Sequence, residues 1–351
     1  MIQTKKSLDQ KLARIHANPS GARDFILADA KDADMAFGVQ APGPNWSDAC
    51  PHGYDRSQGC WKTLEDYRRQ IREVIDQGLV DIMLLSASNL EKLAMEERRF
   101  ERSAITPAAR ANDTTDVWAV RQGKYPTHPS RHFRSAGIDH IKYGKQVNQH
   151  LTPFTGADLG LYSITFTNDI DWDYAALEAF HEFRLEAERK RFRYFLEVFN
   201  PNVDPGFSPE QVGGFLNDHI IRCLAGVTKV GRPLFLKIPY NGPGPLEELA
   251  SYDPGLIVGI LGGSAGTTLD AFQLIHDAQK YGARVALFGR KINLSEHPLA
   301  FIRFLREIVD GNIAPVEAVK AYHAELSAVG IRPQRSLQDD LYLTETRQSY
   351  S

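Results

Sequence analysis

Short apolar runs alternate with helical segments along this chain, and the clearest example lies between residues 233 and 292. Three runs there, PLFLKIPY, GLIVGILGG and VALFGRKI, end abruptly in polar or glycine residues, and each interval between them is long enough for one helix with its turns. Parallel strands joined by helices produce this pattern, and the carboxyl ends of such strands meet at one face. The residues expected to converge there are Lys237, Gly262, Gly263, Gly289 and Arg290.

The same alternation predicts eight strands over the whole chain. They are residues 25–30, 80–85, 115–120, 159–166, 194–199, the run that carries Lys237, 256–261 and 285–288. Helical spacing predicts helices between them, and two further helices, 297–310 and 316–329, form a C-terminal extension before a polar tail at 332–351. A chain of 351 residues accommodates a barrel of roughly 250 residues with insertions. The sequence therefore predicts one domain, residues 1–351, folded as a (β/α)8 TIM barrel.

Two segments interrupt the regular pattern. Residues 31–61 are rich in glycine and proline, and we expect a long first strand-to-helix loop that closes over the ligand as a lid, with Trp46, His52 and Arg56 as candidate contacts. A static surface excursion or a subunit contact is the alternative for this loop. Residues 103–157 have no clean period and are interpreted as an insertion around the third strand.

Composition narrows the range of ligands. Hydrophobic residues make up 42% of the chain and charged residues 24%, as in an ordinary globular protein. The net charge of −3 and the lack of a basic block give no reason to expect nucleic acid or a membrane surface, so a small molecule is the expected partner. No apolar run reaches membrane-spanning length and no signal-peptide pattern begins the chain, which predicts a cytoplasmic protein. We expect it to form a homo-oligomer.

The chain has three cysteines, an odd number, and they are widely spaced. This spacing favours neither a disulfide framework nor a metal-binding pair, so all three are expected to be reduced thiols.

Lys237 is unusual because it lies among apolar residues within a predicted strand. An ammonium group in such surroundings either loses its proton more readily or finds an acidic partner, and only the neutral amine attacks a carbonyl to form a Schiff base. The structural alternative is a lysine at a strand end that reaches water.

The turn GGSAGTT after the seventh strand resembles a phosphate-binding loop. Its backbone amides are unobstructed by large side chains, and they lead into a helix whose first amides are expected to be unpaired and open to an anion. Gly262, Gly263 and Ser264 are the candidates there. After the eighth strand, Gly289 permits close approach and Arg290 permits bidentate contact. Barrels recurrently bind phosphate at these two loops, although glycine at a turn is more often structural.

These closing motifs carry a family resemblance. KIPY, GGSAGTTLDAFQLIHDA and FGRKI resemble the last strands of class I, Schiff-base aldolases of the DhnA and tagatose-bisphosphate aldolase type, while FILADAKDA and FLEVF resemble their first and fifth strands. The resemblance implies that Lys237 forms an imine with a substrate ketone, that Asp29 and Glu197 serve as acid, base or orienting groups, and that no cofactor is needed. The residues alone favour a helix cap or loop acid for Asp29 and a salt-bridge partner in the barrel for Glu197.

The chain also departs from that family. The bisphosphate aldolases carry Asp-Gln-Arg where this chain has Asp29-Ala30-Lys31, and some carry a fourth-strand lysine where GLYSITF has none. A sugar bisphosphate is therefore not favoured as substrate. Lys31, and Arg121 in a basic stretch that ends at Arg134, remain candidates for contact with a second anionic group.

Acidic residues raise a separate possibility. Asp29, Asp32 and Asp34, with the acids of DIDWD at Asp169 to Asp173, could hold a hard divalent cation. Such acids more often cap helices or face solvent, and no metal is predicted.

The combined interpretation is a class I aldolase, an aldehyde-lyase, that cleaves or forms a C–C bond in a small phosphorylated keto compound. The alternatives are a phosphate-binding barrel isomerase, a metal-dependent lyase, and a non-catalytic sugar-phosphate-binding protein on an aldolase scaffold.

Overall fold

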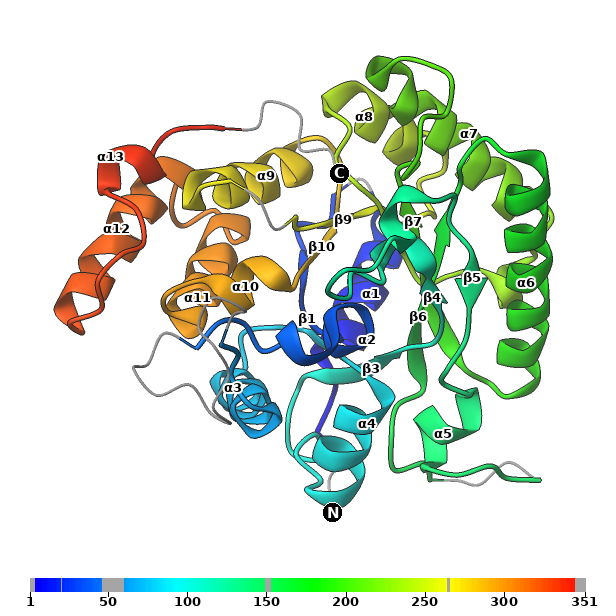
Figure 1. Ribbon diagram of the computed structural model, residues 1–351, viewed down its shortest axis with the longest axis horizontal. Coiled ribbons are helices and arrows are strands. Elements are labelled where there is room, and N and C mark those ends of the chain that lie inside the picture. The colour runs from blue at the N-terminus through cyan, green and yellow to red at the C-terminus, as the bar shows by residue number, and fades with distance from the viewer. Residues whose placement is uncertain (1–3, 20, 46–59, 149–152, 264–265, 345–351) are drawn as a thin grey trace.

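The computed structural model describes residues 4–19, 21–45, 60–148, 153–263 and 266–344 of the chain. Eight parallel strands pair in the order β8-β7-β6-β3-β2-β1-β10-β9. The ring is completed between its two end strands, where the Leu236 amide donates to the Ile257 carbonyl at 2.8 Å and Ile238 pairs with Ile260. The strands are β1 Ile26–Lys31, β2 Ile82–Leu85, β3 Thr106–Arg110, β6 Leu159–Thr165, β7 Arg193–Phe199, β8 Leu236–Lys237, β9 Gly259–Leu261 and β10 Val285–Phe288. The predicted (β/α)8 barrel is confirmed (Figure 1).

Helices surround this ring of strands (Figure 1). The longer ones are α1 Ser7–Ala17, α3 Leu64–Gln77, α6 Ile170–Arg189, α7 Val212–Ala225, α8 Pro243–Tyr252, α9 Thr268–Lys280, α11 Pro298–Val309 and α12 Pro315–Ala328. Shorter ones are α2 Asp34–Phe37, α4 Ala87–Leu90, α5 Ile138–Tyr143, α10 Arg290–Leu294 and α13 Leu337–Asp340. The C-terminal helical extension is confirmed, and α13 lies within the polar tail.

Each strand is buried on both faces, and alternate residues belong to different cores. Ala28, Leu161 and Phe195 belong to the cluster inside the barrel, whereas Leu27 and Leu196 pack outward against helices. Helix α1 contributes Leu8, Leu12 and Ile15 to the inner cluster, so it fills the end of the barrel from which the strands begin. The opposite end, where the strands finish, is left for a ligand.

The third strand lies earlier than the sequence predicted. Residues 106–110 (TPAAR) form β3, while residues 115–117 form a 3-10 turn instead of a strand. The prediction at 115–120 was wrong because β3 carries a proline and two alanines rather than a branched apolar run. Within residues 115–120, the apolar Val117 and Ala119 line a cavity at the barrel mouth.

The connection from β3 to β6 carries the additional structure expected between 103 and 157. A two-stranded antiparallel ribbon, β4 Asp113–Thr114 with β5 His132–Phe133, is followed by α5. Trp118 stacks on Tyr125 with ring centroids 4.8 Å apart, which compacts the tip of this insertion.

The long loop after β1 contains α2 and a bridge between Pro44 and Trp61. Trp46, His52 and Arg56, the candidate lid contacts, lie outside the described residues, so the lid remains a prediction.

Cys60 is disulfide-bonded, so the prediction that all three cysteines are reduced thiols was wrong, whereas Cys223 is free. Among the helices of the described ranges, none combines the length and the apolar character needed to cross a membrane.

Candidate active site

Lys237 and Glu197 form an ion pair inside the barrel. They lie opposite one another on the paired strands β8 and β7, and their side chains bond directly. Lys237 is 7% exposed and Glu197 is 1% exposed. A lysine in apolar surroundings is expected either to lose its proton more readily or to have an acidic partner. Glu197 is that partner for Lys237. The Ser163 hydroxyl donates a further hydrogen bond to Glu197 at 2.7 Å.

Arg110 extends this polar group across the barrel. Its Nε donates to Asp32 at 2.6 Å, and its guanidinium lies 3.6 Å from Glu197 and 3.9 Å from Asp113. Burial lowers the pKa of Arg110, but the surrounding carboxylates outweigh burial and raise it overall. Burial raises the pKa of Asp113 to about 6, although Arg110 opposes that shift. The sequence analysis did not single out Arg110 or Asp113.

A cavity of about 270 Å³ opens over these groups at the carboxyl ends of the strands. Lys237, Glu197, Arg110 and Asp32 line its floor, and Ala33, Ala36 and Phe37 of the loop after β1 line one side. The insertion between β3 and β6 contributes Asp116, Val117, Ala119 and Pro126. The loops after β9 and β10 contribute Gly262, Gly263, Gly289 and Arg290. The predicted nucleophile and the predicted phosphate loops therefore share one cavity.

Asp29 lies apart from that cavity. Because strand residues alternate, Ala28, Ala30 and Asp32 face inward, and Asp29 and Lys31 face the helices. Asp29 pairs with Lys31 at 3.2 Å with both side chains wholly buried, and Lys31 also donates to Asn293 of α10. Burial raises the pKa of Asp29 to about 6 and lowers the pKa of Lys31. The structure therefore does not bring Asp29 together with Lys237, and Asp32 takes the inward position.

The phosphate candidates are arranged differently from the sequence expectation. The Gly262 amide already donates to the Leu287 carbonyl at 2.7 Å, and Gly289 is needed because a Cβ there would lie 2.7 Å from the Ala30 carbonyl oxygen. Gly263, with a φ of +60°, and Arg290 line the cavity. Ser264 lies outside the described residues.

At the start of α9, amides that the sequence led us to expect unpaired have protein acceptors. The amide of Thr267 donates to Asp270 and that of Thr268 to Asp340, each at 2.7 Å. Protein carboxylates thus cap this helix. Within the described residues, an anion at this end of the cavity would rest on Gly263, Gly289 and Arg290.

The candidates for a second anion contact do not line the cavity. Lys31 is buried on the outer face, as described, and Arg121 is exposed on the insertion. Two other arginines of the same basic stretch contact α6. Arg134 pairs with Glu186 at 2.7 Å, and the Arg131 guanidinium lies 3.9 Å from the centre of the Trp172 ring.

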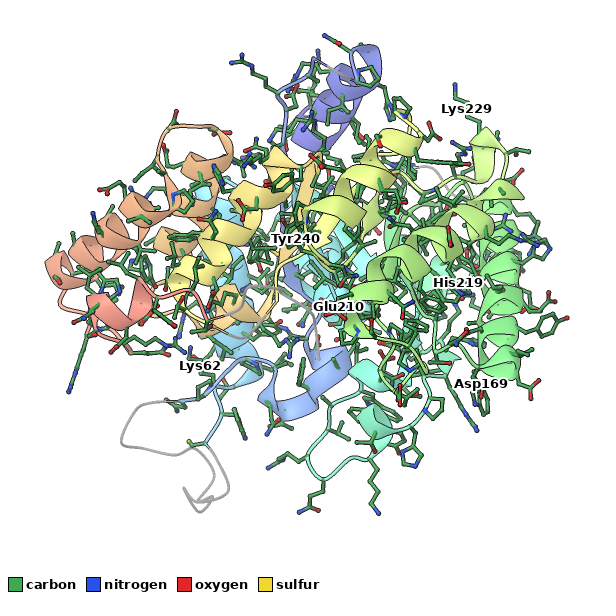
Figure 2. The ribbon with its side chains drawn as sticks, turned by 90° about the horizontal axis from the view of Figure 1, so that it is seen from above. Lys62, Asp169, Glu210, His219, Lys229 and Tyr240 are labelled. Carbon is green, nitrogen blue, oxygen red and sulfur yellow. The ribbon has the colours of Figure 1, made fainter. Side chains whose placement is uncertain are left out.

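The acids considered for a metal have protein partners. Asp169 accepts the amides of Asp171 and Trp172 and caps α6, away from the barrel centre (Figure 2). Asp173 accepts from Thr167 and Asn168, and Asp34 accepts from Ser86. In the ranges that the structure describes, no three His, Cys, Asp or Glu side chains gather as metal ligands would.

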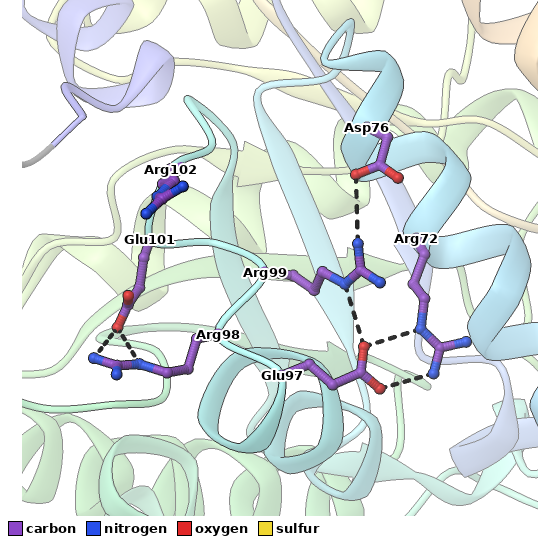
Figure 3. Close-up of a pocket in the computed structure, with 7 residues that line it drawn as sticks. All are labelled: Arg72, Asp76, Glu97, Arg98, Arg99, Glu101 and Arg102. Carbon is purple, nitrogen blue, oxygen red and sulfur yellow. Dashed lines mark hydrogen bonds and ion pairs between the residues drawn. The ribbon is translucent and has the colours of Figure 1, made fainter.

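A larger hollow of about 860 Å³ lies elsewhere, between α3 and the turn before β3 (Figure 3). Its charged side chains bind one another: Arg72 pairs with Glu97 at 2.7 Å, and Arg98 pairs with Glu101. This hollow is open to solvent, and none of the predicted site residues line it. We therefore do not assign it as the active site, although it is larger than the cavity over Lys237.

No known family model matches the sequence, and no curated protein matches it. Among solved structures, the chain is similar to an archaeal fructose 1,6-bisphosphate aldolase, with a TM-score of 0.58 and 15% identity over 87% of this chain and 100% of that one. An archaeal fructose-1,6-bisphosphate aldolase with its catalytic Lys covalently bound to the carbinolamine intermediate of the substrate gives 0.58 and 16%, over 86% and 99%. A protein of Corynebacterium glutamicum gives 0.54 and 15%, over 88% and 94%.

At these identities the likeness shows the fold alone. It confirms that the chain resembles Schiff-base aldolases in its fold, as the closing motifs indicated.

Proposed function

We propose that this protein is a class I aldolase, an aldehyde-lyase that makes or breaks a C–C bond in a small phosphorylated keto compound through a Schiff base on Lys237. The observation that carries the proposal is a lysine buried inside the barrel, bonded to a glutamate and open to the cavity. The fold shared with archaeal aldolases supports it.

The reaction begins when Lys237 transfers a proton to Glu197 and its neutral Nζ attacks the substrate carbonyl carbon. The carbinolamine then loses water, which Glu197 assists by protonating the departing hydroxyl, and an iminium forms. In cleavage, a carboxylate removes the proton of the hydroxyl on the far carbon of the breaking bond, which is β to the iminium carbon. The bonding electrons flow into the iminium and leave an enamine and an aldehyde. Protonation of the enamine and hydrolysis release the ketone and restore Lys237.

Arg110 and Ser163 hold the reacting carboxylate in place. Ser163 donates to Glu197, and Arg110 lies between Glu197 and Asp32. A buried carboxylate with a cation and a hydroxyl beside it keeps a fixed orientation. Asp32 replaces Asp29 as the second candidate acid or base because it lines the same cavity.

The anion end of the cavity yields a prediction for Arg290, which lines it beside Gly289. Arg290→Ala is expected to raise KM and lower kcat/KM by about two orders of magnitude, because a charge-assisted bond contributes roughly 1.5–3 kcal/mol. Arg290→Lys, which keeps the charge but loses the forked geometry, should fall between. Steady-state kinetics of both variants measure this, and an Arg290→Ala enzyme with wild-type KM would place the anion elsewhere.

The end of the cavity opposite Arg290 favours a substrate with a single phosphate. The insertion supplies Asp116 and the apolar Val117 and Ala119 there, while the nearby cation Arg110 already faces Asp32 and Glu197. A second phosphate would meet carboxylates without a compensating cation from the described lining. We expect monophosphorylated ketoses to exceed the matching bisphosphates in kcat/KM by at least about tenfold, since like charges in an interface cost several kcal/mol. Equal values for both would contradict this substrate class.

Borohydride trapping tests the proposed function. The enzyme is mixed with a panel of phosphorylated ketones, starting with dihydroxyacetone phosphate, and reduced with sodium borohydride. Peptide mass spectrometry should find the reduced adduct on Lys237. An enzyme that turns substrate over while Lys237 stays unmodified would exclude the Schiff-base mechanism.

A further inference from the structure

The C-terminal segment, residues 336–344, crosses from α12 to the start of α9, which is the helix that directly follows the glycine loop (Figure 1). It begins with α13, whose first turn is capped by Ser336 through the Asp339 amide. The C-terminal segment is far from the proposed phosphate loop in sequence but lies next to it in the structure.

Asp340 makes the central contact of this segment. One carboxylate oxygen accepts the Thr268 amide at 2.7 Å, and the other bonds His323 Nε2 at 2.9 Å. Asp340 is 3% exposed and His323, on α12, is 8% exposed. A buried aspartate thus joins the first residue of α9 to a helix of the C-terminal extension.

Two further residues of the segment bind the same turn. The Tyr342 carbonyl accepts the Thr267 hydroxyl at 2.9 Å. Thr344 donates its amide to Asp270 at 2.9 Å and its hydroxyl at 2.6 Å. All these contacts fall between residues 267 and 270, and none of them is needed to begin the helix, because Thr267 and Asp270 already form a complete capping box.

The turn is also held from the side of the second phosphate loop. Lys291, the residue after Arg290, donates to the Gly266 carbonyl at 2.7 Å. Gly266 has a φ of +81°, which only glycine adopts readily. The end of the glycine loop is therefore fixed on one side by the loop that carries Arg290 and on the other by the C-terminal segment.

We propose that the C-terminal segment 336–344, through Asp340 and Thr344, is a positioning element for the phosphate loop: it fixes the end of the loop at residues 266–268 so that Gly263 is aligned with Gly289 and Arg290. This inference rests on the proposed phosphate site. A ligand contact held within a fraction of an ångström depends on such outer support. A segment that served only stability would act on the whole fold rather than on the affinity for phosphate.

The experiment compares two shortened chains and two point variants with the wild-type enzyme. A chain that ends at residue 335 lacks the segment, and a chain that ends at Thr344 keeps every contact described and is the matched control. Asp340→Ala removes both acceptors, and Asp340→Asn keeps one, in case the shorter chain fails to fold. Isothermal titration with inorganic phosphate gives Kd, steady-state kinetics give KM and kcat, and borohydride trapping with a non-phosphorylated ketone reports on Lys237.

For the chain ending at 335 and for Asp340→Ala, we expect Kd for phosphate and KM to rise about fivefold to tenfold, in line with the loss of a helix-terminus carboxylate contact, with kcat changed less than about twofold. Asp340→Asn should lie between Asp340→Ala and wild type, and the control chain should match wild type. Trapping of the non-phosphorylated ketone should be unchanged. Unchanged phosphate affinity in a folded Asp340→Ala enzyme overturns the proposal, as does a wild-type enzyme that binds no phosphate. Failure of the Schiff base alone would instead appear as phosphate binding without any adduct on Lys237.

Discussion

Lys237→Met is expected to abolish turnover and borohydride trapping while the fold survives. Methionine keeps the bulk of the apolar stem and removes the amine that the Schiff base requires. Removing one partner of a buried ion pair usually destabilises a protein because the other charge is left alone. Here Glu197 keeps the Ser163 hydroxyl at 2.7 Å and the Arg110 guanidinium at 3.6 Å, which limits that cost.

The measurement combines activity, thermal unfolding and phosphate titration. Activity should fall below detection, and the Kd for inorganic phosphate should stay within about threefold of wild type, since Arg290 and the glycine loops are untouched. Lys229→Met, at an exposed lysine on the outside of the barrel, is the matched control and should behave as wild type (Figure 2). A Lys237→Met protein that unfolds would identify Lys237 as a structural residue, and one that remains active would remove it from the mechanism.

The pairing of Lys237 with Glu197 could be anticipated from sequence because both strands keep their apolar pattern up to the charged residue. In β7 and β8 the residues around Glu197 and Lys237 are apolar on both faces, so a charge within the run stands out. Adjacent parallel strands in register then bring the two together. The apolar pattern located both charged residues, whereas their catalytic roles came from the family resemblance.

The position of Asp29 could not be derived in the same way. Residues 25–30 are apolar almost throughout because both faces of β1 are buried, so the run does not reveal which face Asp29 takes. The alternation of inward and outward residues, continued past the end of β1, is the signal that identifies Asp32 as the inward acid. Ala28 and Ala30 lie inside, and Asp32 continues that face.

Arg110 was missed for a related reason. It ends β3, a strand with little apolar character of its own, and the more apolar residues 115–120 took its place in the prediction. A hydrophobic pattern cannot distinguish apolar residues that line a cavity, such as Val117 and Ala119, from those of a strand. The capped start of α9 was equally hidden, since Asp340 lies 72 residues along the chain from Thr268.

Glu197→Gln is expected to lower kcat/KM by about 10²- to 10⁴-fold, the usual contribution of a positioned acid or base. Glutamine has nearly the same shape and accepts the Ser163 hydrogen bond, but it takes no proton from Lys237 and leaves the ammonium without its counterion. Neither the proton transfer from Lys237 nor the departure of water would then be assisted, so the rate of borohydride trapping should fall together with turnover.

Asp32→Asn separates the roles of Asp32 and Glu197, two of the carboxylates that line the cavity, because Asp32 bonds Arg110 at 2.6 Å whereas Glu197 bonds Lys237. If Glu197 serves the imine and Asp32 only holds Arg110, Asp32→Asn should retain normal trapping and lose less activity than Glu197→Gln. Glu178→Gln, an exposed glutamate on α6, provides the matched control for the loss of a surface carboxylate. The reverse order, with trapping intact in Glu197→Gln and lost in Asp32→Asn, would transfer the proton-transfer role to Asp32.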